Sequence, residues 1–178
     1  EIGSGRMCEP ADIASAAFEL AVKRPQSLAG KTAIVTAGPT VEPIDSVRFI
    51  ANHSSGKQGY AIAAALAARG ASVTLISGPV TLTAPASVNC VSVQTAMQMQ
   101  AAVNAALPAD IAICAAAVAD WRVAEARHGK LKKPDHHNAA GMRLSLIENP
   151  DILASLGQSD KRPSVLIGFA AETGDMLE

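Results

Sequence analysis

From about residue 30 onward, compact apolar runs alternate with polar, glycine-rich segments. The apolar runs 32–36, 71–77, 110–115 and 164–169 have the length and aliphatic content of buried parallel strands. Between them, the segments 60–70, 94–107 and 150–156 favour helices, the first rich in small residues that suit close packing on a sheet. Strands that alternate with helices predict a Rossmann-like, doubly wound α/β fold with a mainly parallel sheet and helices on both faces.

The two ends and one internal segment fit this pattern less well. The first 28 residues contain an amphipathic run from Pro10 to Lys23 and are typical of a tail or linker, so we place the domain at residues 29–178. Met142–Ile147 alternates in polarity, which favours either an extra edge strand or part of an arm. The chain ends just after a predicted strand, so we expect the sheet to be truncated at its C-terminus.

Composition narrows the class of protein. The 178 residues carry a formal net charge of −1, which gives no basic excess to attract nucleic acid. The apolar runs are shorter than the roughly 20 residues that span a bilayer. Cys8, Cys90 and Cys114 lie far apart, which argues against a disulfide framework or a thiolate zinc site. We therefore expect a cytoplasmic protein that binds neither nucleic acid nor membrane.

The loops that follow the predicted strands hold the candidate site, because open α/β sheets bind ligands beyond the carboxyl ends of their strands. SSGKQG, at residues 54–59, offers hydroxyls, glycine amides and a helix amino terminus, a combination that binds phosphate. A loop that only caps its helix would have the same pattern. The Walker A and G-x-G-x-x-G patterns are both absent, which disfavours a P-loop enzyme and a nicotinamide oxidoreductase.

Charged residues follow the third predicted strand. Asp120 stands where a carboxylate could contact a ribose or Mg²⁺, but also where Asp commonly caps a helix. HGKLKKP, at residues 128–134, carries three lysines that could neutralise a polyphosphate or form an ordinary solvated loop. The four histidines lack metal-ligand spacing. Cys114 lies in an apolar run and is interpreted as a buried, unreactive thiol.

Several long segments together resemble one known family. VTAGPTVEPIDSVRFIANHSSGKQG, AICAAAVADWR, KLKKP, ENPDIL and IGFAAET resemble, in order and spacing, the phosphopantothenate–cysteine ligase part of the bifunctional bacterial coenzyme A biosynthesis protein. The opening IGSGRMCEP resembles the last loop of the FMN-dependent phosphopantothenoylcysteine decarboxylase part that precedes the ligase. The resemblance implies that residues 1–28 are a decarboxylase tail and linker, and that FMN belongs only to the upstream half.

The resemblance also implies a reaction. The family joins 4′-phosphopantothenate to L-cysteine at the expense of CTP, through an acyl-cytidylate that forms with release of pyrophosphate. The cysteine amine then displaces CMP to give phosphopantothenoylcysteine. Mg²⁺ and lysines are expected on the departing pyrophosphate, where negative charge develops. A homodimer is also expected from the resemblance.

Site residues are assigned by matching positions. Asn52 matches an asparagine that contacts the acyl-cytidylate, and Lys130 matches the lysine of a loop that grips the triphosphate, so both are expected to be catalytic. Arg48 matches an arginine near the phosphopantothenate site. The other expected nucleotide contacts are Cys114, Ala115, Ala116, Asp120, Pro150, Asp151, Ile152, Leu153 and Phe169. No metal ligand is assigned, and two further nucleotide-binding lysines of the family are expected beyond Glu178.

A second hypothesis belongs to a different class. The chain would be a noncatalytic nucleotide-binding or dimerisation module that binds CTP but releases no pyrophosphate in the presence of phosphopantothenate. The expected truncation favours this reading for the chain as it stands.

Overall fold

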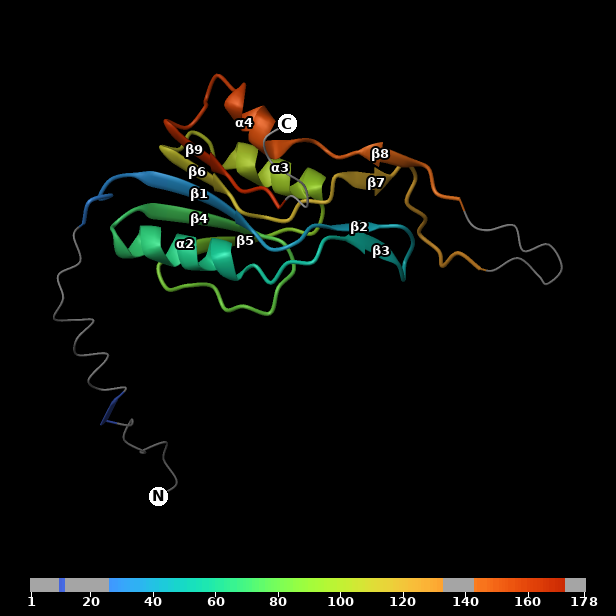
Figure 1. The fold of residues 1–178 in the computed structure, drawn as a ribbon, viewed down its shortest axis with the longest axis horizontal. Coiled ribbons are helices and arrows are strands. Elements are labelled where there is room, and N and C mark those ends of the chain that lie inside the picture. Colours follow the sequence, from blue (N-terminus) through green and yellow to red (C-terminus); the bar gives the residue numbers. More distant parts are fainter. Residues whose placement is uncertain (1–9, 12–25, 133–142, 172–178) are drawn as a thin grey trace.

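The main sheet has five parallel strands in the computed structural model, which describes residues 10–11, 26–132 and 143–171 (Figure 1). The strands are β1 (Thr32–Ala37), β4 (Ser72–Ser77), β5 (Val88–Ser92), β6 (Ile111–Cys114) and β9 (Val165–Gly168). They lie in the order β5-β4-β1-β6-β9, so the direction in which strands are added reverses between β1 and β6. The predicted Rossmann-like, mainly parallel sheet is confirmed.

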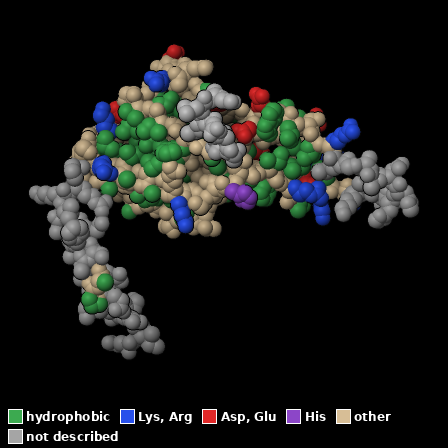
Figure 2. Space-filling view, viewed as in Figure 1, with side chains coloured by type: hydrophobic (Ala, Val, Ile, Leu, Met, Phe, Trp, Pro, Cys, Tyr) green, Lys and Arg blue, Asp and Glu red, His purple; other side chains and the backbone are tan. Residues whose placement is uncertain are grey.

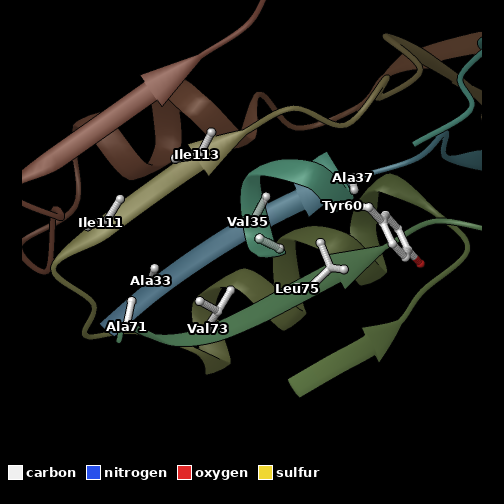
Figure 3. Packing of buried hydrophobic residues seen from close by; sticks show 10 residues of the cluster. Ala33, Val35, Ala37, Tyr60, Ala71, Val73, Leu75, Ile111 and Ile113 are labelled. Carbon is white, nitrogen blue, oxygen red and sulfur yellow. The ribbon is translucent and has the colours of Figure 1, made fainter. Parts of the chain in front are cut away.

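Helices cover both faces of this sheet, as predicted. They are α2 (Lys57–Ala68), α3 (Ala96–Ala105) and α4 (Ile152–Gly157). Because successive strand residues point to opposite faces, Val35 packs in the core beneath α2 while Ile34 packs in the core beneath α3 and α4. Figure 3 shows the first of these cores, in which β1, β4 and β6 contribute side chains from one face and Tyr60 joins them from α2.

The sequence patterns identified four of the five main strands and missed β5. Among the described residues this strand pairs only with β4, from the Val73–Val88 pair to the Ser77–Ser92 pair, and therefore lies at the edge of the sheet. Asn89 and Ser92 are exposed on it. An edge strand needs no continuous apolar run, so its polar residues resemble those of a loop.

Two short antiparallel ribbons form an arm outside the main sheet (Figure 1). One consists of β2 (Val41–Pro43) and β3 (Phe49–Ala51), and the other of β7 (Trp121–Val123) and β8 (Leu146–Glu148). β2 lies beside β7. Of the two readings of Met142–Ile147, the structure supports the arm, because β8 pairs with β7 and not with the main sheet.

The arm carries much of the exposed apolar surface of the described residues. Figure 2 shows hydrophobic side chains gathered over the arm and, in a second group, over the main sheet. The exposed residues of the arm include Val47, Phe49, Trp121, Leu146 and Ile147.

Two glycines let the loops at the carboxyl edge of the sheet approach one another. A Cβ atom on Gly78 would lie 1.7 Å from the carbonyl oxygen of Pro39, and one on Gly59 would lie 2.5 Å from the Cβ of Ala37. Only glycine fits where backbone approaches this closely. The loops after β1 and β4 and the first turn of α2 therefore meet at one edge.

Some sequence predictions lie outside the described residues. These are Cys8, the His136–His137 pair, and the run Pro10–Lys23 except for Pro10 and Ala11. Within the part of the chain that the structure describes, no helix has the length and apolar character needed to cross a membrane.

Candidate functional site

An open cavity of about 1120 Å³ lies at the carboxyl ends of β1, β6 and β9. Its walls are formed by residues 51–54, 114–121, 148–153 and 168–171, together with Thr36 and Gln58. This is the edge at which the strand order reverses, where open α/β sheets characteristically bind ligands. The fold therefore brings the loops after the first, third and fourth predicted strands to one place.

Most of the residues expected in the site surround this cavity. Those that line it are Asn52, Cys114, Ala115, Ala116, Asp120, Pro150, Asp151, Ile152, Leu153 and Phe169. Arg48 and Lys130 do not line it. Both belong to segments that meet on the arm, at the turn between β2 and β3.

The backbone at the end of β6 is held by its neighbours. The N–H of Ala115 donates to the carbonyl oxygen of Thr36 at 3.2 Å, and the N–H of Ala116 donates to Thr36 Oγ1 at 3.3 Å. The carbonyl of Cys114 accepts from the N–H of Phe169 at 3.1 Å. Ala115 and Ala116 can therefore offer a ligand their carbonyl oxygens, which are hydrogen-bond acceptors, but not their N–H groups.

Asn52 reaches across the cavity mouth to the same loop. Its Nδ2 donates to the carbonyl oxygen of Val118 at 3.0 Å. The next residue of the loop is fixed from the opposite side, because the N–H of Ala119 donates to the buried hydroxyl of Thr40 at 2.9 Å. A side-chain amide has two N–H groups and one oxygen, so Asn52 keeps one donor and one acceptor for a ligand.

Asn149 also holds this loop, and the sequence reasoning did not single it out. Its Nδ2 donates to the carbonyl of Ala119 at 2.8 Å, and its backbone N–H donates to the carbonyl of Asp120 at 2.7 Å. Arg122 Nη1 in turn donates to Asn149 Oδ1 at 3.0 Å. An asparagine before a proline is common in turns, so nothing in the local pattern indicated that it joins two walls of the cavity.

The two aspartates at the cavity differ in role. Asp151 Oδ1 accepts from the N–H of Ala154 at 2.8 Å and caps α4. Asp120 is exposed and leads into β7 and not into a helix, so the capping reading of Asp120 is wrong. Among the described residues, no donor to the Asp120 carboxylate is recorded. This carboxylate is therefore the more available of the two to a ligand.

Cys114 is half-buried and lines the cavity. Burial, followed by the nearby negative charge of Asp151, raises the pKa of its thiol to about 11. A thiol with such a pKa stays protonated at neutral pH and is a poor nucleophile. The expectation of an unreactive cysteine agrees with this environment.

The SSGKQG segment has features of a loop that caps its helix and features of a loop that binds phosphate. Ser54 Oγ accepts from the N–H of Gly56 at 3.3 Å, and Ser55 Oγ accepts from the N–H of Lys57 at 3.4 Å, so part of the helix start is capped internally. No acceptor is recorded among the described residues for the N–H groups of Gln58 and Gly59. Unpaired N–H groups at a helix start favour an anion, and Gln58 lines the cavity.

The acidic side chains of the cavity do not form a resident metal centre. Within the described ranges, no group of three or more His, Cys, Asp or Glu side chains could hold a metal ion. The carboxylates that line the cavity belong to Asp120, Glu148 and Asp151. Because Mg²⁺ is often held by one or two carboxylates together with substrate phosphates, this donor set fits an ion that arrives with a nucleotide.

Comparison with known proteins gives consistent matches. The family described as "DNA/pantothenate metabolism flavoprotein C-terminal domain" matches residues 28–178. A curated relative from Haemophilus influenzae, "Coenzyme A biosynthesis bifunctional protein CoaBC", is 47% identical over 97% of this chain and 42% of its own length. The protein of the same name from Escherichia coli K12 is 47% identical over 100% of this chain and 44% of its own length. The chain thus spans less than half the length of these relatives.

A solved structure matches as well. The crystal structure of the C-terminal domain of a coenzyme A biosynthesis bifunctional protein CoaBC has a TM-score of 0.71 and 41% sequence identity to this chain. The match covers 84% of this chain and 69% of the solved one. The similarity therefore extends over most of the described residues.

Proposed function

The chain belongs to the family of DNA/pantothenate metabolism flavoprotein C-terminal domains, and on this premise we propose that it performs CTP-dependent ligation of 4′-phosphopantothenate with L-cysteine. The substrate carboxylate attacks the α-phosphate of CTP, and pyrophosphate leaves. The cysteine amine then attacks the acyl carbon of the acyl-cytidylate, and CMP leaves. The observation that carries the proposal is the convergence of Asn52, Asp120 and residues 150–153 on one cavity.

The floor of the cavity suits a nucleobase with an exocyclic amino group. The carbonyl oxygens of Ala115 and Ala116 are acceptors, whereas their N–H groups are already bonded to Thr36. The cytosine amino group could donate to such acceptors. Adenine also has an amino group, so the preference for CTP rests on the family resemblance and is tested below against ATP.

The proposed role of Asn52 follows from its remaining donor. One N–H of its amide holds Val118, and the other is available for the acyl oxygen on which negative charge develops. A donor fixed before the reaction stabilises that charge without the cost of reorganisation. Because the amide is neutral, it also adds no charge that would repel the incoming carboxylate.

Charge neutralisation at the triphosphate is assigned to Mg²⁺ and Lys130. A magnesium ion bound to the nucleotide would withdraw electron density from the α-phosphate, and Asp120 or Glu148 could hold it, since Asp151 caps α4. Lys130 does not line the cavity of its own chain, so its contact with the triphosphate is assigned to the cavity of a second copy of the chain. A homodimer therefore stays part of the proposal. FMN-dependent decarboxylation is proposed only for the part of the whole protein outside this domain.

The direct test is pyrophosphate release by the purified protein. We expect release with CTP, Mg²⁺ and phosphopantothenate, faster than with ATP, and CMP release only after L-cysteine is added. Lys130→Ala should reduce kcat/KM for CTP by about tenfold or more, because a charge-assisted hydrogen bond contributes about 1.5–3 kcal/mol. Lys161→Ala, at an exposed position after α4, is the matched control. CTP binding without any pyrophosphate release would favour the noncatalytic module instead.

A further inference from the structure

The turn between β2 and β3 is built around a buried carboxylate. The Asp45 side chain has 0% of its surface exposed and forms an ion pair with Arg48 Nη1 at 2.8 Å. Its Oδ1 accepts from the N–H groups of Val47 at 2.7 Å and Arg48 at 2.8 Å. These contacts are local and are those of an ordinary aspartate turn.

The second oxygen of Asp45 reaches a distant segment. Asp45 Oδ2 accepts from the N–H of Leu131 at 3.0 Å, and Arg48 Nη2 donates to the carbonyl of Leu131 at 3.2 Å. The ion pair thus binds both the N–H and the carbonyl of Leu131, which lies 86 positions from Asp45 in the sequence. The bond from Leu131 is the foremost cause that lowers the pKa of Asp45 below its ordinary value.

Leu131 belongs to the loop that carries Lys130. A second backbone bond, from the N–H of Arg127 to the carbonyl of Ile44 at 3.1 Å, docks the loop four residues earlier. Lys130 lies between these two anchor points and is exposed. Its backbone position is therefore set by Asp45 and its neighbours, although none of them lines the cavity.

We propose that Asp45 is a positioning residue that holds the Lys130 loop and the Arg48 guanidinium in one fixed arrangement, so that a single carboxylate orients both cations for anionic substrates. The inference rests on the proposed function, because it assigns the two cations to CTP and phosphopantothenate. Removal of the carboxylate charge would leave the N–H of Leu131 and the Arg48 guanidinium without their shared partner. Buried or partly buried groups left unpaired in this way favour rearrangement of the segment.

The substitution Asp45→Asn separates the contact with Leu131 from the hydrogen bonds within the turn. An asparagine retains one oxygen that can accept from Val47 and Arg48, as is common in such turns. In place of Oδ2 it presents an amide NH₂, which cannot accept from Leu131 or pair with Arg48. The turn is thus kept while the hold on the loop is lost.

The kinetic test is a double-mutant cycle on the full chain. Measured with phosphopantothenate saturating, so that the Arg48 contact is satisfied, Asp45→Asn should lower kcat/KM for CTP by about tenfold or more. The same change in a Lys130→Ala background should lower it less than about twofold, because interacting residues are not additive. Asp110→Asn is the matched control, since its carboxylate also accepts a backbone and a lysine donor but lies at the amino end of the sheet. It should leave kcat/KM unchanged. Equal losses from Asp45→Asn in both backgrounds would overturn the proposal.

Amide hydrogen exchange followed by NMR tests the docking without any turnover. The Leu131 amide should exchange more slowly than the Gly129 and Lys130 amides, for which the structure records no acceptor among the described residues. Asp45→Asn should remove this protection, and Asp110→Asn should not. Fast exchange at Leu131 in the unmodified chain would overturn the docking. A protected Leu131 in a chain that releases no pyrophosphate would instead refute the proposed function and support the docking.

Discussion

The side-chain amide of Asn52 donates a hydrogen bond to the carbonyl oxygen of Val118, with 3.0 Å between Nδ2 and the oxygen. The two residues come from different loops, one before α2 and one after β6, and both line the same cavity. The bond fixes the plane of the amide, so its remaining N–H has a defined direction. A donor oriented in this way is what acyl transfer requires at the developing oxyanion.

Asn52→Asp tests this arrangement. The substitution replaces the NH₂ by a carboxylate oxygen, which would face the Val118 carbonyl as a second acceptor and would add a negative charge beside the acyl group. We expect formation or breakdown of the acyl-cytidylate to slow by about 100-fold, as when one oxyanion donor is lost. Rapid-quench single turnovers measure both steps. Asn104→Asp, at an exposed position of α3, should change neither; wild-type rates in the Asn52 variant would contradict the assignment.

The sequence predicted most of this cavity because strand ends and loops follow local rules. The apolar runs located β1, β4, β6 and β9, and the rule that parallel sheets bind ligands at their carboxyl edge brought the loops after them together. Asn149 was missed because its partners, Ala119 and Asp120, lie about 30 positions away in the sequence. Hydrogen bonds between loops of this kind leave no periodic pattern.

The positions of the charged residues on the arm also depend on contacts that the sequence pattern does not reveal. Arg48 and Lys130 were expected with the other site residues, yet they lie outside the cavity, in two segments that meet at the β2–β3 turn through Leu131. The ribbons β2–β3 and β7–β8 have only three residues in each strand, which is too short for a pattern of alternation to stand out. Their position depends on tertiary contacts such as those of Asp45.

Gly78→Ala should destabilise the carboxyl edge of the sheet. The added Cβ would lie 1.7 Å from the carbonyl oxygen of Pro39, so backbone would have to move. Overpacking of this kind costs about 1–3 kcal/mol. Urea unfolding measures the difference. Gly157→Ala is the control, because its Cβ would lie 3.9 Å from Leu166 in ordinary contact; a loss for Gly78→Ala no larger than for this control would contradict the close approach.

Cys114 should resist alkylation near neutral pH. With a pKa raised to about 11, the thiolate fraction at pH 8 is about one in a thousand and rises about tenfold per pH unit. Iodoacetamide labelling read by mass spectrometry should therefore accelerate steadily from pH 7 to pH 10. Asp151→Asn keeps a residue that caps helices but removes the charge that contributes to the shift, so it should speed labelling at fixed pH. Labelling that levels off below pH 9 would argue against a raised pKa.

Acid should destabilise the fold through Asp110. The carboxylate accepts from the N–H and hydroxyl of Thr32 and from Lys31, and these bonds, the first of them most strongly, lower its pKa from 3.8 to about 2. Between these values the unfolded chain binds the proton and the folded chain does not, so this contribution to stability is present above about pH 4 and is lost as the pH falls toward 2. Urea unfolding from pH 7 to pH 2 measures the loss. Asp110→Asn should be less stable at neutral pH and should show a shallower decline in that window, because it has no proton to gain. If the decline is equally steep in this variant, the acid sensitivity belongs to other carboxylates and the Asp110 contacts with Lys31 and Thr32 do not persist in solution.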